Sequence, residues 1–222
     1  MLDQRLRLFA SQKEALSKLE ALFFAEAESR TLILSGESGS GKSTVVQEFL
    51  NGFSGTIRGY TTVRHRSADG KQVAFQHLLL SDASIPLELT LEYPDKLPAD
   101  FEYFLMRDET QLVFDRKAFM KLAEYMSPVQ ILKNRQPDLM LWDEVGGEEL
   151  LVDSFYETLI YWLKKKDKPA QIIVWKKQHH KSKLRLAHLC ATEIELLDKR
   201  RQTILDYPAV YIYDLDSENI IL

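Results

Sequence analysis

The stretch Gly36–Ser43, with the sequence GESGSGKS, places three glycines, a lysine and serine hydroxyls between two apolar segments. The residues before it, 31–35 (TLILS), are apolar and β-branched at two positions, which is typical of a buried strand. The residues after it, 44–50 (TVVQEFL), carry apolar side chains at the spacing of a helix with one buried face. The stretch is therefore predicted to be a tight turn from a strand into a helix.

The spacing of this turn matches G-x-x-x-x-G-K-[ST], the pattern of the phosphate-binding P-loop. Its glycines allow the backbone to wrap tightly, so that successive N–H groups converge on a phosphate at the positive end of the helix. We expect Lys42 to reach the β- and γ-phosphates and the Ser43 hydroxyl to hold Mg²⁺. The predicted nucleotide-binding residues are Gly36, Glu37, Ser38, Gly39, Ser40, Gly41, Lys42, Ser43 and Thr44.

The composition is that of a globular protein, with 28% charged and 45% apolar residues among 222. We expect a single P-loop domain over residues 1–222, with 1–30 as an N-terminal helical extension. The formal net charge of −4 gives no general attraction to nucleic acid or to an anionic membrane. No apolar run approaches the roughly 20 residues that span a bilayer, and no signal peptide is recognisable, so the chain is expected in the cytoplasm. The single cysteine, Cys190, is expected to be buried.

The first half of the chain contains two further patterns. Residues 3–28 read as one or two amphipathic helices, which either pack on the protein's own sheet or form an arm that docks a partner protein. Residues 56–63 and 72–80 are predicted to form a hairpin around a polar turn. Residues 84–111 are interrupted by three prolines and receive no assignment.

The second half alternates helices and strands, which favours an α/β fold with a mostly parallel sheet covered on both faces. Residues 139–142 (LMLW) form a continuous apolar run, as expected of a strand buried on both faces. The other predicted elements are helices over 114–126, 150–165 and 199–205, a short helical segment over 130–135, and strands over 171–175, 191–196 and 210–213.

Two acidic residues follow the apolar run of 139–142. A P-loop needs a carboxylate at the end of a neighbouring strand to complete the Mg²⁺ shell, and Asp143 has the required place. Glu144 can accept a proton from a water aligned on the γ-phosphorus, so we predict that it is the general base of a hydrolysis reaction. A positive group near the transferred phosphoryl would also help, and the candidates are Arg64, Arg66, Arg200 and Arg201.

These motifs together resemble a small family of nucleoside-triphosphatases first described in thermophiles, whose human member is called cancer-related nucleoside-triphosphatase. The resemblance covers about residues 30–205, and it rests on the P-loop, 59–62 (GYTT), Arg66, 70–75 (GKQVAF), Phe114-Asp115, 143–150 (DEVGGEEL) and 199–201 (KRR). It implies a RecA-like P-loop fold, Mg²⁺-dependent hydrolysis of ATP, GTP and other triphosphates, and Glu144 as the base. It also implies that Arg201 lies near the phosphates. The chain departs from the family pattern at Gly147-Glu148 and at Arg200.

We therefore predict Mg²⁺-dependent binding and hydrolysis of a nucleoside triphosphate. Two alternatives remain at this stage: a nucleotide kinase with a small acceptor, and an interaction module switched by nucleotide through residues 3–28. The basic stretch 176–185 is interpreted as a solvated helix end and loop, with an anion contact or a lid over the nucleotide as the alternative. The pair His179-His180 lacks neighbours at metal-ligand spacing.

Overall fold

The structure is a computed structural model, which describes residues 10–24, 31–81, 90–99, 101–107, 112–133, 136–177, 189–208, 210–216 and 220–221. The strands of these ranges belong to one sheet. They are β1 (Thr31–Ser35), β2 (Ile57–Ser67), β3 (Val73–Ser81), β4 (Thr90–Tyr93), β5 (Tyr103–Arg107), β6 (Leu112–Phe114), β7 (Leu139–Val145), β8 (Ala170–Trp175), β9 (Val210–Asp214) and β10 (Ile220–Ile221).

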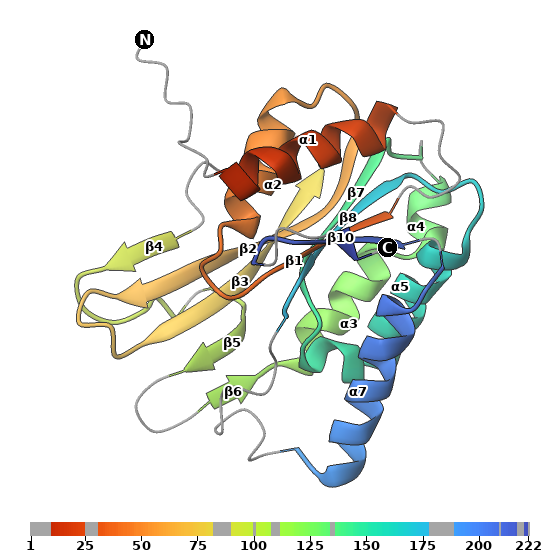
Figure 1. Ribbon diagram of the computed structural model, residues 1–222. Coiled ribbons are helices and arrows are strands. Elements are labelled where there is room, and N and C mark those ends of the chain that lie inside the picture. Colours follow the sequence, from red (N-terminus) through yellow and green to blue (C-terminus); the bar gives the residue numbers. More distant parts are fainter. Residues whose placement is uncertain are drawn as a thin grey trace.

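The helices of the described ranges join these strands and cover the sheet. They are α1 (Ala10–Phe24), α2 (Lys42–Gly52), α3 (Arg116–Tyr125), α4 (Pro128–Lys133), α5 (Asp153–Lys164) and α7 (Ala191–Leu205), with a 3-10 turn η1 at Glu148–Leu151. In Figure 1, α1 and α2 lie on one side of the sheet, and α3, α5 and α7 lie on the other.

The sheet has a parallel centre and an antiparallel extension. Its strand order is β10-β9-β1-β8-β7-β2-β3-β5-β6. The run from β9 to β2 is parallel throughout, whereas β3, β5 and β6 continue the sheet in antiparallel pairs. Strand β4 pairs in parallel with the outer half of β2. The predicted α/β fold, with a mostly parallel covered sheet and a hairpin extension, is confirmed.

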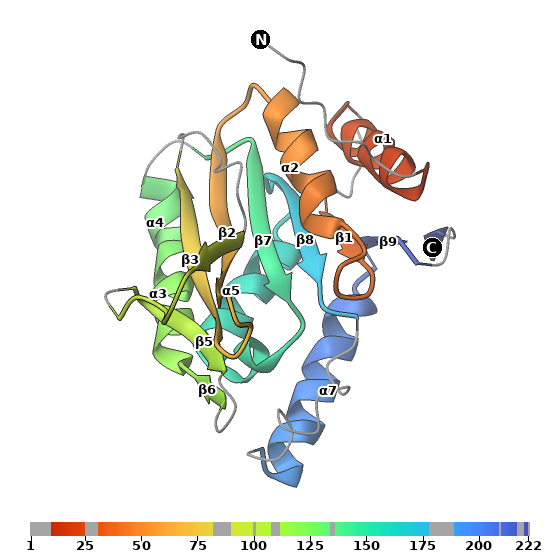
Figure 2. The same cartoon turned by 90° about the vertical axis from the view of Figure 1, so that its left-hand side faces the viewer.

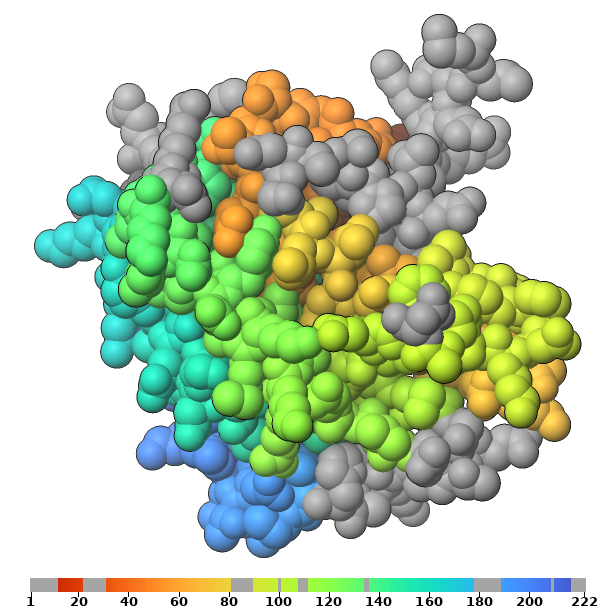
Figure 3. Space-filling view, turned by 180° about the vertical axis from the view of Figure 1, so that it is seen from behind, coloured from red at the N-terminus to blue at the C-terminus, as the bar shows by residue number. Residues whose placement is uncertain are grey.

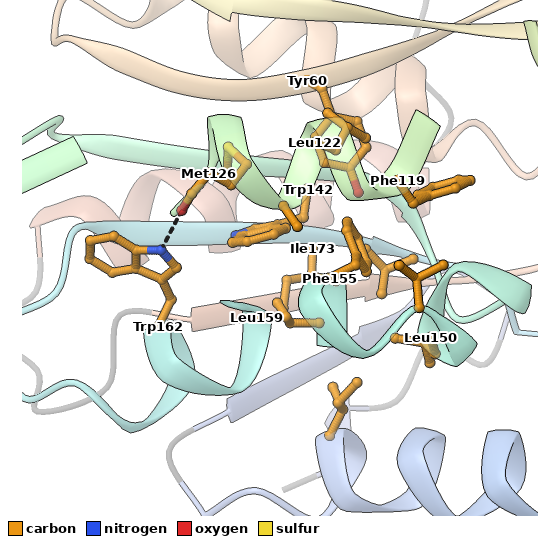
Figure 4. Close-up of a cluster of buried hydrophobic side chains, with 14 of the residues drawn as sticks. Tyr60, Phe119, Leu122, Met126, Trp142, Leu150, Phe155, Leu159, Trp162 and Ile173 are labelled. Atoms are coloured by element: carbon orange, nitrogen blue, oxygen red, sulfur yellow. Dashed lines mark hydrogen bonds between the residues drawn. The ribbon is translucent and has the colours of Figure 1, made fainter. Parts of the chain in front are cut away.

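Two apolar cores hold the layers together, because successive residues of a strand point to opposite faces. On one face, Leu32 and Leu34 of β1 pack with α1 and α2. On the other face, Ile33 joins a larger cluster with α3, α5 and α7. Figure 4 shows this second core, where the aromatic rings of Tyr60, Trp142 and Phe155 meet edge to face. This arrangement fixes β7, β2 and the helices that follow the candidate site.

Helix α1 belongs to the same packing unit as the P-loop helix. Its residues Ala15 and Leu19 are fully buried in the core beside α2. The interpretation that this segment packs on the protein's own sheet layer is therefore supported for 10–24, whereas residues 3–9 and 25–28 lie outside the described ranges. Among the described residues, no helix is long and apolar enough to cross a membrane.

The segment that received no assignment forms the outer part of the extension. Within 84–111, Thr90–Tyr93 and Tyr103–Arg107 are strands whose partners, β2 and β3, lie far away in sequence. Short apolar patches between prolines give no such pairing by themselves. In the space-filling view from behind, β5 and α3 form one continuous surface, with α7 below them (Figure 3).

Two expectations for the region around residue 190 were wrong. Residues 191–196 are not a strand but the first part of α7, which begins at Ala191. Alternation over six residues fits a strand, but Leu197 and Ile204 are buried at helical spacing and Glu193 accepts a hydrogen bond from the Cys190 N–H at 3.1 Å. Cys190 is exposed rather than buried, because it occupies the N-cap of this helix at the surface.

Candidate functional site

The GESGSGKS stretch joins β1 to α2 as predicted. Residues Gly36–Gly41 form the loop, and Lys42, Ser43 and Thr44 form the first turn of α2. Gly39 and Gly41 have φ of 87° and 90°, a region that side chains disfavour, and Gly41 is the N-cap of the helix. In Figure 2, β7 and β8 point toward the same end of the sheet as this loop. The loop therefore lies at the carboxyl edge of the parallel strands.

The side chain of Lys42 folds back onto the P-loop. Its Nζ donates hydrogen bonds to the carbonyl oxygens of Gly36 and Glu37, at 2.7 and 2.8 Å. Burial lowers the pKa of Lys42, while the charges of Glu144 and then Asp216 act in the opposite direction. The lysine is thus electrostatically coupled to a residue that follows it by about a hundred positions in the chain. The tertiary fold brings the P-loop and Glu144 to one place.

Asp143 is fixed at the end of β7 through one of its two oxygens. Its Oδ2 accepts hydrogen bonds from the Thr61 hydroxyl and from the Thr62 N–H, both at 2.8 Å. Its Oδ1 is buried and has no hydrogen-bond partner among the described residues. Burial, followed by the charge of Glu144, raises the pKa of Asp143 to about 6. A buried carboxylate oxygen without a partner costs free energy unless it binds a ligand. An oxygen left free in this way is what we expect of a residue that binds a metal.

The expectation that Asp143 sits on the strand next to the P-loop strand was wrong by one strand. Strand β8 pairs with β1 on one side and with β7 on the other. The sequence orders the strands along the chain, but it does not fix their order in the sheet. Since all three strands are parallel, Asp143 still lies at the same edge as the loop.

The available oxygens fit Mg²⁺. The Ser43 hydroxyl and the free Oδ1 of Asp143 are hard donors, which Mg²⁺ prefers, and the ion commonly completes its shell with phosphate oxygens and water. Within the described residues there is no group of three or more His, Cys, Asp or Glu side chains that could hold a metal on its own. A metal here would therefore depend on the nucleotide for part of its shell.

Glu144 has an unusual backbone. Its φ is 64°, which makes it the non-glycine residue with positive φ in the described structure. The pairing of β7 with β8 shifts register between Trp142 and Val145, so Glu144 lies in a bulge. Its side chain is 36% exposed and its Oε2 lies 3.3 Å from Lys176 Nζ. Two adjacent acids thus have different environments: Asp143 is buried and held, and Glu144 reaches toward solvent.

Lys176 and Glu149 were not among the predicted site residues. Lys176 follows β8 directly and its Nζ lies 4.0 Å from the Oε2 of Glu149, which is fully buried. Glu149 Oε1 accepts from the Gly147 N–H, and its Oε2 has no hydrogen bond among the described residues. Lys176 was grouped with the stretch 176–185, of which 178–185 lie outside the described ranges together with His179-His180. Its position directly after an apolar run in the sequence, like that of Asp143, was the signal that could have distinguished it.

The predicted arginines occupy different places. Arg201 donates to the carbonyl of Gly146 and to those of Lys176 and Lys177, at 3.0 and 3.2 Å for the latter two. It therefore ties together the loops that follow β7 and β8, and its catalytic role stays a prediction.

Arg200 bonds to the Leu150 carbonyl and to Asp153. Arg66 pairs with Glu92, and Arg64 is exposed on the same hairpin. Arg66 is thus engaged with a residue of the extension, whereas Thr61 and Thr62 of the same strand β2 bond to Asp143.

Two more elements contact the P-loop. The side-chain amide of Gln12, on α1, donates to the Ser40 carbonyl at 3.2 Å. After β9, Asp216 Oδ2 accepts from the Glu37 N–H at 2.7 Å and from Lys177 Nζ at 3.2 Å. The P-loop is thus supported by Gln12 from near the N-terminus and by Asp216 from near the C-terminus. Sequence analysis did not predict these contacts, because both residues are remote from the loop in sequence.

No protein-family model and no curated protein matches the chain. Among solved structures, it is similar to the crystal structure of THEP1 from the hyperthermophile Aquifex aeolicus. The match has 15% sequence identity and a TM-score of 0.49, and it covers 85% of this chain and 91% of that chain. The similarity is one of fold.

Proposed function

We propose that the chain binds a nucleoside triphosphate together with Mg²⁺ and hydrolyses it to the diphosphate and phosphate. The observation that carries the proposal is the left-handed backbone of Glu144, directly after the held carboxylate of Asp143. A left-handed glutamate costs roughly 1–2 kcal/mol, and such strain persists mainly where the geometry serves a function. In a hydrolytic site beside a P-loop, one acid has to be held in place to bind the metal and its neighbour has to face the attacking water. The backbone of Glu144 turns its side chain away from that of Asp143 in this way.

The residues divide the chemistry as follows. The N–H groups of the loop and Lys42 bind the phosphates, while Ser43 and Asp143 hold Mg²⁺, which neutralises charge on the β- and γ-phosphates when bound. Glu144 accepts a hydrogen bond from a water aligned on the γ-phosphorus and takes its proton as the oxygen–phosphorus bond forms. The bond between the γ-phosphorus and the bridging oxygen breaks, and the diphosphate leaves. ATP and GTP are the proposed substrates.

A turnover screen tests the proposal. Purified protein is incubated with ATP, GTP, CTP or UTP and Mg²⁺, each with and without a panel of nucleoside monophosphates. We expect phosphate release that needs no acceptor and that disappears in the Lys42→Ala variant, because the P-loop has lost its cation. Diphosphate formation that depends on an acceptor would replace hydrolysis with kinase transfer. Tight nucleotide binding without turnover would favour the switch alternative.

A further inference from the structure

We propose that Lys176 is a second phosphate-binding cation, which exchanges the Glu144 carboxylate for the γ-phosphate of a bound triphosphate and thereby releases Glu144 to act on water. This inference rests on the proposed triphosphate site, and it assigns to that site a device that recognises the third phosphate.

The backbone of Lys176 is fixed between the two halves of the site. Strand β8 runs between β1, which leads into the P-loop, and β7, which carries Asp143 and Glu144 near its end. The Lys176 N–H donates to the Val145 carbonyl at 2.7 Å, and its own carbonyl accepts from Arg201 at 3.0 Å. The backbone of Lys176 is therefore held at the carboxyl edge of the sheet, beside both the P-loop and the acids of β7.

The two carboxylates that face Lys176 differ in burial and in hydrogen bonding. Glu149 is fully buried and is held by the Gly147 N–H, so it is a fixed anchor for the ammonium. Glu144 is 36% exposed, and its contact with Lys176 Nζ, at 3.3 Å, is the closer of the two. Lys176 thus pairs with two acids. Glu144 can separate from it without becoming a buried, unpaired charge, because its side chain is partly exposed. Lys176 can keep Glu149 as its anchor while a phosphate replaces Glu144.

Other described cations near this edge already have different contacts. Arg201 bonds to three loop carbonyls, and Lys177 bonds to Asp214 and Asp216. Lys176 pairs with Glu144 at 3.3 Å, and the charge of Glu144 acts to raise the pKa of Lys42. A γ-phosphate between these two lysines would meet positive charge from both sides, and this arrangement stabilises the charge of phosphoryl transfer.

The exchange makes hydrolysis depend on a complete triphosphate. While Lys176 Nζ lies 3.3 Å from Oε2 of Glu144, that oxygen is engaged in the ion pair and is not available to orient a water. The γ-phosphate brings additional negative oxygens, which compete with Glu144 for Lys176. A diphosphate lacks those oxygens, so it leaves the Lys176–Glu144 pair intact.

The test measures binding by calorimetry, for a non-hydrolysable triphosphate analogue and for the diphosphate, both with Mg²⁺. Lys176→Met should weaken the binding of the analogue by about 10- to 100-fold, the range for a hydrogen bond to a charged group. It should change the affinity for the diphosphate by less than about 3-fold. Lys176→Arg should restore part of the difference. The matched control is Lys164→Met, an identical change at the exposed C-terminal turn of α5, which should leave both affinities unchanged.

A double-mutant cycle tests the exchange itself. Glu144→Gln removes the competing charge, so it should tighten analogue binding several-fold in the wild-type background and have no such effect in Lys176→Met. Equal losses for both nucleotides would assign Lys176 a merely structural role, and unchanged affinities would exclude its phosphate contact. These measurements use binding alone, so an absence of turnover would refute hydrolysis without deciding the role of Lys176. Wild-type protein that binds neither nucleotide would overturn both proposals.

Discussion

Replacing Glu144 by glycine and by alanine separates the cost of its backbone conformation from the chemistry of its carboxylate. Its φ of 64° costs a residue with a side chain about 1–2 kcal/mol. Glycine avoids that cost but loses roughly 0.5–1 kcal/mol more conformational entropy on folding than alanine does. The glycine variant should therefore be more stable than the alanine variant by about 1 kcal/mol. Both variants lose the contact with Lys176, so the comparison isolates the backbone.

Equilibrium unfolding in urea, without nucleotide or Mg²⁺, measures this difference as a shift in midpoint at unchanged slope. The same variants should lose at least about 10²-fold in single-turnover hydrolysis, because neither side chain can accept a proton. Glu144→Gln should lose turnover to the same extent without weakening nucleotide binding, because glutamine retains the shape and hydrogen bonding of the side chain.

Three results would refute this reasoning. Equal stability of the glycine and alanine variants would show that residue 144 is not held in the left-handed region. Hydrolysis by Glu144→Gln within a few-fold of wild type would remove Glu144 as the base. A loss of nucleotide affinity in Glu144→Gln as severe as that of Lys42→Ala would instead give the carboxylate a structural or metal-binding role.

Further predictions concern the P-loop lysine, the proposed metal ligand and a partly buried histidine. Lys42→Ala should weaken triphosphate binding in calorimetry by about 10-fold or more, since it removes a charged donor from the phosphates; unchanged affinity would exclude the loop as the site. Asp143→Asn should raise the Mg²⁺ concentration needed for half-maximal turnover, and a titration that overlays wild type would exclude the metal role. Burial, with the charge of Lys176 as a second cause, lowers the pKa of His77 from 6.5 to about 3. The unfolded chain therefore binds this proton first, so the wild type should lose stability below about pH 6.5, by at most about 1.4 kcal/mol per pH unit. Urea unfolding near pH 7 and near pH 5.5 should show a smaller loss in His77→Phe, and equal losses would contradict the burial of this ring.

The sequence specified the elements that carry strong local signals. The glycines of GESGSGKS and the apolar segments on either side predicted the turn from β1 into α2, because only glycine adopts positive φ freely. The apolar run 139–142 predicted β7, because a strand covered on both faces needs apolar side chains on both. The strand over 191–196 was wrong, because a short alternating pattern also fits one face of a helix.

The sequence by itself therefore determined the P-loop, the acidic pair that follows the apolar run 139–142, and the α/β class, since each depends on neighbouring residues. Only the tertiary structure decided the order of the strands, and with it the place of Lys176 between the loop and Glu144. It also decided that Asp143 keeps one oxygen free, because the donors to its other oxygen come from β2, about eighty positions earlier. Strand pairing and burial depend on contacts between segments remote in sequence, and no local pattern of side chains encodes them.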